Sequence, residues 1–533
     1  MPVLTAIDLL GIQRYVFASN RLRDSVAASW LVHWATGRDG ALAAAARFDG
    51  EVLLGSGGNA LIRFERRGSA LDFTAHYSRH LYDRAPGLEV VVEHLEYEPG
   101  ELARALQRLQ VLLARAKLER APSTPLLGIS VTAPCAVTGL PASGFDPQES
   151  DVPLSRMVLR WRDPQLRQEA SQRWAAFLDG DDRFAFPDVI DEMGRTFGET
   201  SLIGVVHVDG NGIGDKVRTW LEECIENRLP DEKVLEQLRE WSSAVDERGR
   251  RAFQSVVDRV RQAVRSDANE ARIEGSVPDL GFDLRRSNGH TLLPLRPVLL
   301  GGDDLTFICD GRIALDLAET ALEAFSANIS HLGSVTACAG VAVVPAHAPF
   351  DRAYELAEAL CGNAKRGRRV REDDGAWLDW HLGTPRPGES VPSLRDRAYR
   401  SGRREDRSRG RALSWTLTCR PYRLGRDPRD SETWKWLVRT VLDGRSNGFR
   451  GERWREHRNK VKELQAVVRE GPKGVQRARE AWTVARKLQL PGGLDATNGF
   501  LDGERTPLLD AIELLDLHLP LGASEQSKGD AGR

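Results

Sequence analysis

Two distant segments of this 533-residue chain carry the same short pattern of residues. Each holds an apolar run, a pair of glycines and a second apolar run, in EVLLGSGGNALIRF (51–64) and in PVLLGGDDLTFI (297–308). Apolar runs joined by glycines predict a β-hairpin. Each hairpin also follows a predicted strand that ends in an aspartate, Asp8 in TAID and Asp209 in VVHVD. The repeat predicts two related domains, with chance similarity between two common hairpins as the alternative.

The two copies differ at the hairpin tip. Where the second copy has Asp303 and Asp304, the first has Asn59 and Ala60. This difference predicts that the second domain carries a carboxylate site and that the first domain has lost it.

Helical segments surround both hairpins and predict an α+β fold. Leucines at helical spacing (Leu102, Leu106, Leu109 and Leu113) predict an amphipathic helix over 100–117. In the second half, the predicted order is strand, helices, hairpin, helix, strand, helix. This order predicts an antiparallel sheet with helices over one face.

Changes in composition divide the chain further. Residues 366–411 are rich in Arg, Gly, Asp and Ser, which predicts a basic, loop-rich segment. The predicted parts are a first α+β domain (1–145), a helical linker domain (146–196), a second α+β domain (197–425), a C-terminal helical domain (426–520) and a disordered tail (521–533).

Bulk properties exclude several classes of protein. The net charge is -2, so nucleic-acid binding would need a local basic patch. The sequence has no run of about 18 apolar residues and does not start like a signal peptide, so we expect a cytoplasmic protein that does not bind membranes. The 6 cysteines stand singly, without a C-x-x-C pair, so we expect no structural zinc.

The tip of the second hairpin predicts a metal site. Glycines let the backbone approach a ligand closely, and Asp303 and Asp304 would lie there beside Asp209 if its strand is the neighbour. Three carboxylates repel one another unless a cation neutralises them, and such hard oxygen ligands suit Mg²⁺ or Mn²⁺ bound with substrate phosphates. Two such ions can activate a ribose hydroxyl and stabilise a pyrophosphate leaving group. The alternative is an ordinary hairpin whose aspartates solvate a turn.

Several elements together resemble the large palm-domain subunit of type III CRISPR effector complexes, a polymerase- and cyclase-like protein. The matching segments are IDLLGIQRYVF, GSGGNALIRF, TGLPAS, VVHVDGNGIG, LLGGDDLTF, VTACAGVAVVPAHAPFDRAYELAEALCGNAK and WTLTCRPYRL, within 1–145 and 195–425. The resemblance implies two palm (ferredoxin-like, nucleotidyl cyclase-type) domains, the first degenerate, with helical insertions and a C-terminal helical domain.

The resemblance also implies roles for single residues. Metal ligation would fall to Asp209 with the backbone of Gly210, and to Asp303 with Asp304, which would form the catalytic centre.

A second group of residues would contact the nucleotide. Gly301 and Gly302 would lie under it, and Lys365 would meet its triphosphate. Lys216 is a weaker phosphate candidate, for which a solvated helix lysine is the alternative. Asn211 stands where the related proteins usually have a carboxylate, and this change would retune the site.

The activity implied by the resemblance is pyrophosphate-releasing nucleotidyl transfer with two Mg²⁺ or Mn²⁺ ions. ATP would be the substrate and a cyclic oligonucleotide second messenger the product, in bacterial antiviral defence. Expected partners are RNA or CRISPR effector subunits, a second copy of the chain, and a downstream effector that reads the product. The chain has no His-Asp dipeptide, so the HD nuclease domain and its single-strand DNase activity are not expected. A stand-alone bacterial relative outside a CRISPR complex is an open alternative.

Two other functions remain as alternatives. Arginines at 366–371, 403–404 and 450–458 could bind RNA in a scaffold protein that has lost catalysis, although neighbouring acids favour a solvated surface. A diguanylate cyclase would need a DxDxFK start, which DGNGIGDK lacks. His207 lies on the same strand face as Asp209, where we expect a packed histidine rather than a ligand.

Overall fold

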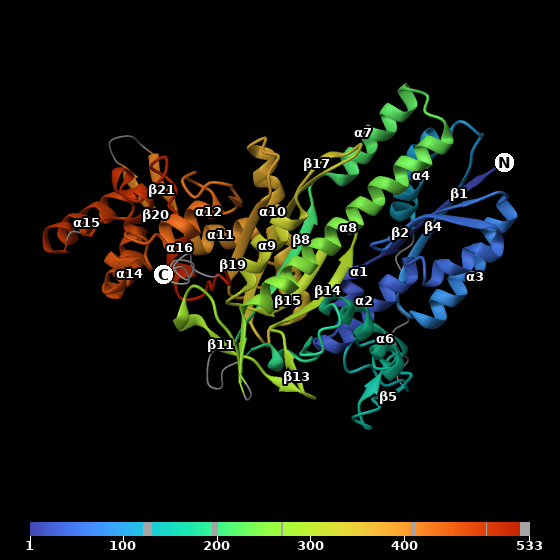
Figure 1. The fold of residues 1–533 in the computed structure, drawn as a ribbon, viewed down its shortest axis with the longest axis horizontal. Helices are drawn as coiled ribbons and strands as arrows, with labels where there is room; N and C mark the ends of the chain where they lie inside the picture. Colours follow the sequence, from blue (N-terminus) through green and yellow to red (C-terminus); the bar gives the residue numbers. More distant parts are fainter. Residues whose placement is uncertain (121–130, 195–200, 268–269, 407–410, 487, 523–533) are drawn as a thin grey trace, which may run out of the picture.

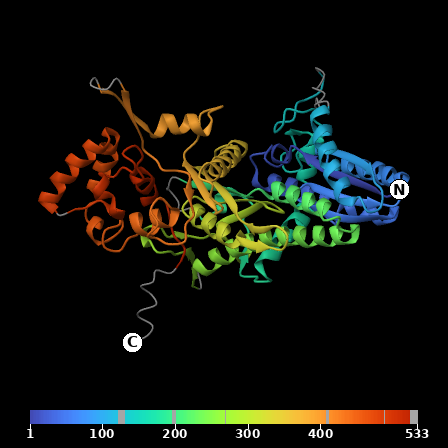
Figure 2. The same ribbon diagram turned by 90° about the horizontal axis from the view of Figure 1, so that it is seen from above.

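The computed structural model describes residues 1–120, 131–194, 201–267, 270–406, 411–486 and 488–522. Their elements lie in three parts along the long axis of the molecule (Figure 1), and the view from above shows the same order (Figure 2). The first sheet lies at one end, the second sheet in the middle and the C-terminal helices at the other end. Most of the predicted tail, from residue 523 on, lies outside the described residues. None of the helices so described is long and apolar enough to cross a membrane.

The first sheet has four strands in the order β2-β3-β1-β4, and every neighbouring pair is antiparallel. Its strands are β1 (Val3–Leu10), β2 (Gly50–Ser56), β3 (Asn59–Phe64) and β4 (Glu89–Glu96). The helices of this part are α1 (Ile12–Val16), α2 (Leu22–Thr36), α3 (Arg67–Arg84) and α4 (Leu102–Glu119). The predicted hairpin and the predicted leucine-rich helix are therefore confirmed as β2–β3 and α4.

The second sheet repeats this topology and extends it. Its order is β14-β15-β8-β18-β19-β22, of which the first four strands match β2-β3-β1-β4 in order and direction. The strands are β8 (Leu202–Gly210), β14 (Leu295–Gly301), β15 (Asp304–Asp310), β18 (Ala337–Pro345), β19 (Trp377–Leu382) and β22 (Tyr422–Arg423). Strand β19, which pairs parallel to β18, lies in the segment predicted to be loop-rich, so that prediction is wrong there.

Both hairpins also contain the same irregularity. The register shifts at Leu53 in β2 and at Val298 in β14, at equal distances from the hairpin tip. Two hairpins that share a bulge at the same offset are related more closely than two chance hairpins. The internal repeat predicted from the sequence is thus present in the strand order and in the bulge.

The pairing corrects the alignment of the two tips by one position. Asp8 pairs with Asn59, and Asp209 pairs with Asp304. Asn59 is therefore the counterpart of Asp304, not of Asp303, whose counterpart is Gly58. A strand register fixes such equivalences, whereas two aligned apolar runs can slip by one residue.

Helices cover both faces of the second sheet, contrary to the single covered face predicted. On one face, Phe253 of α8 (Asp231–Ala263) lies with its ring 6.4 Å from that of Phe307. On the other, Tyr354 of α10 (Phe350–Val370) lies 5.5 Å from the ring of His207. Strand β18 is buried along nearly its whole length, the pattern of a strand covered on both sides. Helix α9 (Ala314–Phe325) packs beside α8.

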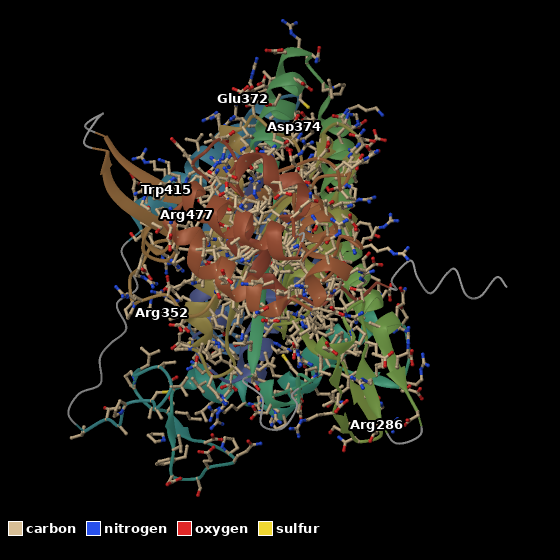
Figure 3. The ribbon with its side chains drawn as sticks, turned by 90° about the vertical axis from the view of Figure 1, so that its left-hand side faces the viewer. Arg286, Arg352, Glu372, Asp374, Trp415 and Arg477 are labelled. Atoms are coloured by element: carbon tan, nitrogen blue, oxygen red, sulfur yellow. The ribbon has the colours of Figure 1, made fainter. Side chains whose placement is uncertain are left out.

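The remaining elements connect and extend these two sheets. Between them lie β5 (Gly144–Phe145), β6 (Pro153–Leu154), α5 (Arg156–Trp161), α6 (Pro164–Ala175) and β7 (Phe184–Ala185), and α7 (Ile213–Glu226) follows β8. After β19 come α11 (Val391–Tyr399), β20 (Arg400–Asp406), β21 (Arg411–Thr416), α14 (Arg458–Val467), α15 (Pro472–Arg486) and α16 (Leu508–Leu515). Figure 3 faces this end of the molecule, where Trp415 and Arg477 are labelled.

A buried polar network joins the C-terminal helices to the second sheet. The guanidinium of Arg420 lies 3.0 Å from Asp510 and 3.1 Å from Glu513, and its side chain is fully buried. Asp510 also accepts a hydrogen bond from the Tyr422 hydroxyl at 2.8 Å. A buried charge of this kind is stable only when it is paired. The segment Arg420-Pro421-Tyr422 is therefore a structural junction between the second sheet and the C-terminal helices.

Candidate active site

The ends of β8 and β15 bring two of the predicted acids face to face. Asp209 pairs directly with Asp304, and Asp303 lies at the tip between β14 and β15. Gly210 allows this arrangement, since a Cβ there would lie 2.7 Å from Oδ2 of Asp303. The second sheet therefore collects Asp209, Asp303 and Asp304 at one edge, as the sequence predicted.

A lysine from α10 neutralises part of this charge. The Lys365 ammonium lies 2.6 Å from Oδ2 of Asp209 and donates a hydrogen bond to the Gly210 carbonyl at 2.8 Å. The side chain thus bridges helix α10 and the end of β8. It lies beside the acids rather than out in solvent, within reach of an anion bound there.

The other two acids lack such a partner. Burial, followed by the charge of Asp209, raises the pKa of Asp303, and the same causes raise the pKa of Asp304 well above its usual range. Oδ1 of Asp304 is buried and accepts no hydrogen bond from the part of the chain that the structure describes, although Nδ1 of His207 lies 3.4 Å from it. His207 is not a counter-ion, because burial lowers its pKa and keeps it neutral. A buried carboxylate oxygen without a hydrogen-bond donor, beside other carboxylates that repel it, is suited to bind a divalent cation.

A cavity of about 410 Å³ opens beside Asp209 and Asp303. Its floor is Asp209, Gly210, Asp303 and Lys365, and one wall is the start of α7. The other lining residues are Gln110, Gly212, Ile213, Gly214, Asp215 and Arg218. The cavity therefore joins a carboxylate cluster, two cationic side chains and a helix N-terminus.

The start of α7 is shaped to approach a ligand. Gly212 caps the helix with φ +64°, a conformation that favours glycine. The unpaired N–H groups and the dipole of a helix N-terminus attract phosphate groups. Arg218, on the same helix, pairs with Asp215 at 3.0 Å in an exposed position and is free to turn toward an anion. A triphosphate between α7 and Lys365 would lie directly beside the acids.

Asp304 and four other predicted residues lie outside the lining of this cavity. Lys216 donates to the Leu332 carbonyl at 3.0 Å. Asn211 is 2% exposed and donates to Thr336 at 3.0 Å, so it faces the protein interior. The remaining two are Gly301 and Gly302, at the back of the hairpin tip.

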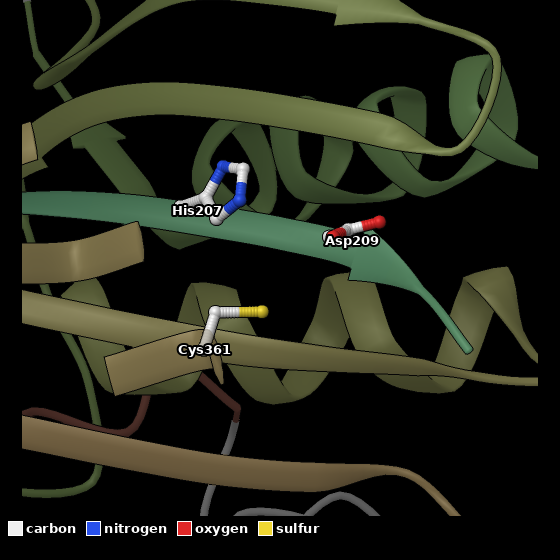
Figure 4. A group of neighbouring side chains, drawn as sticks. All are labelled: His207, Asp209 and Cys361. Atoms are coloured by element: carbon white, nitrogen blue, oxygen red, sulfur yellow. The ribbon is translucent and has the colours of Figure 1, made fainter. Parts of the chain in front are cut away.

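One group of three possible ligand atoms lies within 4.8 Å of one another in the described residues: His207, Asp209 and Cys361 (Figure 4). The atoms of His207 and Cys361 are already engaged. The histidine Nδ1 lies 3.0 Å from the Thr306 hydroxyl, and the thiol donates to the Cys338 carbonyl at 3.3 Å. Burial raises the pKa of the Cys361 thiol well above its usual range, so it is protonated. His207 is a packed residue, as predicted, and this group is an unfavourable metal site.

The first sheet holds a counterpart that the sequence interpretation missed. The Lys117 ammonium, on α4, forms an ion pair with Asp8 just as Lys365 does with Asp209. Gly11 caps α1 with φ +61°, as Gly212 caps α7. The shared pattern Asp-x-x-Gly-Ile, in DLLGI and DGNGI, was the available signal.

The first half also contributes side chains to the second. Gln110 of α4 lines the cavity beside Asp209, although it belongs to the first half. Gln13, after β1, donates to Glu358 of α10 at 3.3 Å. Two side chains of the first half thus reach the cavity and helix α10 of the second half.

Comparisons with known proteins find similarity in structure. No model of a protein family matches the chain, and no curated protein sequence matches it. A Csm1-Csm4 cassette in complex with one ATP matches with a TM-score of 0.52 and 15% identity, over 97% of this chain and 70% of that chain. The cassette in complex with pppApA matches with a TM-score of 0.50, 15% identity and coverages of 97% and 69%.

Csm1 of T. onnurineus matches with a TM-score of 0.50 and 15% identity, over 97% of this chain and 70% of that chain. The similarity extends over nearly the whole chain and includes both sheets. The chain therefore has the mixed helix-and-sheet fold of Csm1, as its resemblance to the large subunit of type III CRISPR complexes led us to expect.

Proposed function

We propose that this chain is a metal-dependent nucleotidyltransferase that joins and cyclises nucleotides, with ATP as the first substrate. The observation that carries the proposal is the cavity that places Asp209, Asp303 and Lys365 opposite a helix N-terminus. Fold neighbours bound to ATP and to pppApA support the choice of nucleotide. The sheets at 1–145 and 197–425 are then a degenerate and an active palm domain, and the product is a cyclic oligonucleotide of antiviral defence.

The acidic residues of the site would bind the metal ions. Asp209, the Gly210 carbonyl, Asp303 and Asp304 would hold two Mg²⁺ or Mn²⁺ ions. Bound there, the ions would activate the attacking ribose hydroxyl and neutralise charge on the triphosphate.

The cationic and backbone groups would orient the donor nucleotide. Lys365 exchanges its contact with Asp209 for the triphosphate, and the N–H groups at the start of α7 hold the leaving pyrophosphate. The acceptor nucleotide lies toward the first half, where Asp8 and Lys117 form the equivalent pair. Gln110 reaches across from that half and orients the donor.

Partners follow from the same neighbours. The two neighbours bound to ATP and to pppApA are Csm1-Csm4 cassettes, which supports CRISPR effector subunits as partners of this chain. The RNA-binding arginines proposed near 366–371 are partly neutralised, since Arg368 lies 3.7 Å from Asp374 and Arg371 lies 3.7 Å from Glu432. Figure 3 shows Asp374 beside Glu372 at this edge. Arg403 and Arg404 have side chains outside the described residues.

A scaffold protein that has lost catalysis is the second candidate. It is favoured by the inward-facing Asn211, which supplies no carboxylate to the cavity. It is also favoured because the three aspartates are not among the groups of ligand atoms that lie within 4.8 Å of one another in the described residues. In that case Lys365 is a permanent partner of Asp209.

Labelled ATP and GTP, each with Mn²⁺ and with or without RNA, test the proposal when products are separated by chromatography. We expect a cyclic product and pyrophosphate from ATP with the native chain, and none with a D303N/D304N double variant. A product from GTP alone would assign a diguanylate cyclase. Absence of product from either nucleotide, in protein that binds ATP and Mn²⁺, would overturn the proposal in favour of the scaffold.

A further inference from the structure

A second and larger cavity lies behind the hairpin tips. Its volume is about 750 Å³, within the range of about 300–1,000 Å³ typical of small-molecule sites. It is enclosed by α2, α6, α8 and the ends of β2 and β14. Its lining includes Trp30, Trp34, Phe177, Arg84, Arg173 and Arg250. Aromatic rings and guanidinium groups therefore line one partly open cavity, together with the carboxylates of Asp39, Glu169 and Asp246.

One of these guanidinium groups lacks an acidic partner. Arg173 donates to the Leu300 carbonyl at 2.8 Å and stacks 4.3 Å from the ring centre of Trp174. No carboxylate of the described residues lies within 4.0 Å of it, whereas Arg84 pairs with Glu169 at 2.7 Å. A partly buried arginine that faces a cavity without a carboxylate is suited to bind an anion.

The pKa values of two residues that line the cavity agree with an anion-binding site. Burial, followed by the charge of Arg250, lowers the pKa of Arg173 to about 9. Burial, followed by the charges of Arg173 and Arg250, lowers the pKa of His33 to about 3. Burial is the larger cause of both shifts, the arginines add to it and Asp246 opposes it, so an anion bound there would relieve the repulsion between the arginines.

We propose that this cavity binds a nucleoside monophosphate, with its base against the aromatic lining and its phosphate on Arg173 and Arg250. The aromatic walls favour a planar ring, and the two guanidinium groups favour a phosphate. Binding at this site does not depend on the function proposed above.

The same arginines also support the hairpin tips. Arg173 holds the carbonyl of Leu300, and Arg250 lies 2.9 Å from Asp246. Asp246 accepts a hydrogen bond from Ser56 at 3.0 Å, at the tip of the first hairpin. Burial raises the pKa of Asp246. Contacts with Arg250, Ser56 and the backbone N–H of Gly302 outweigh burial, so the pKa of this carboxyl is lowered overall. A phosphate drawn to the arginines therefore changes the contacts of both tips, and with them the position of Asp303. Control of catalysis by this route rests on the proposed function.

Titration with AMP, followed by calorimetry, tests the binding. We expect R173M and S243E to weaken AMP binding by about tenfold or more, since each removes or cancels a charge-assisted contact. Ser243 is an exposed residue of the lining, so S243E leaves the tip contacts in place. K365M, in the other cavity, should bind AMP at this site as the native chain does. AMP binding that is unchanged in R173M and S243E, or lost in K365M, would overturn the proposal.

Ribose 5-phosphate separates a nucleotide site from a simple phosphate site. It should bind more weakly than AMP, and equal affinity would exclude recognition of the base. Hydrogen exchange of residues 300–304 in K365M tests the link to the tips without any assay of activity. AMP should slow exchange there, and exchange that stays constant while AMP binds would disprove the coupling.

Discussion

Gly57 and Gly301 touch through their main chains, so the two hairpin tips meet with no side chain between them. A Cβ on Gly301 would lie 2.4 Å from the Cα of Gly57, and one on Gly57 would lie 3.1 Å from the Gly301 carbonyl. The contact brings the tips of the two hairpins together. It gives Gly301 a structural role in addition to the nucleotide contact expected of it.

Substitution G301A should push the tips apart. Because backbone atoms cannot yield as a flexible side chain can, we expect a loss of about 1–3 kcal/mol in the free energy of unfolding. Denaturant unfolding measures this loss. G362A is the matched control, since Gly362 lies in α10 with no atom within 4 Å of the added Cβ. That variant should gain up to about 1 kcal/mol from helix propensity.

Substitution D304N should stabilise the metal-free protein and weaken its response to metal. Like charges directly opposite in a sheet are destabilising, so removal of one charge opposite Asp209 should raise the free energy of unfolding by about 0.2–1 kcal/mol. The rise in melting temperature with Mn²⁺ should shrink, because a ligand is lost. D215N, at the exposed wall of the same cavity, should keep the full response. An equal loss in both variants would contradict a metal at Asp304.

Substitution K365M should reduce nucleotidyl transfer by about 10²–10³-fold, the usual effect of removing one preorganised charge from a reacting anion. Initial rates with ATP and Mn²⁺ measure it. K216M is the control: its ammonium lies on the Leu332 carbonyl outside the cavity, so its rate should stay near that of the native chain. A larger effect in K216M would reverse the assignment of the phosphate ligand.

Substitution N211D restores a carboxylate to the sequence but should not restore a metal ligand. Asn211 is buried and donates to Thr336, whose hydroxyl in turn donates to the Asp374 carbonyl. An aspartate there buries a charge without a donor and should cost about 1–3 kcal/mol in the free energy of unfolding. N227D, at the exposed end of α7, should cost less than about 1 kcal/mol. Tighter Mn²⁺ binding by N211D would show that residue 211 does face the metal.

Periodicity and spacing were sufficient for the elements that hold the site. The hairpin with Asp303 and Asp304, the strand that ends in Asp209 and the helix that carries Lys365 all follow from local patterns. Their convergence follows from pairing of neighbouring strands, which the repeat implied.

Other features depend on information that a local pattern does not contain. The direction of Asn211 is set by the turn after β8, where side chains no longer alternate, and that of Lys216 by its place in α7. Strand β19 carries Asp379 and His381 among its apolar residues, and its pairing with β18 and β22 makes it part of the sheet. Lys117 was missed because the alternation of charge along α4 resembles a solvated face, and its partner Asp8 lies far away in the sequence.

The bulges at Leu53 and Val298 show two equivalent units joined in one chain. Separate copies of such a unit would associate through one self-complementary surface, and each substitution would then appear in both at once. Joined copies escape this constraint, so Asn59 could replace an acid while Asp304 was kept. Their association is also intramolecular, and dilution of the protein should leave the contact between Gly57 and Gly301 intact.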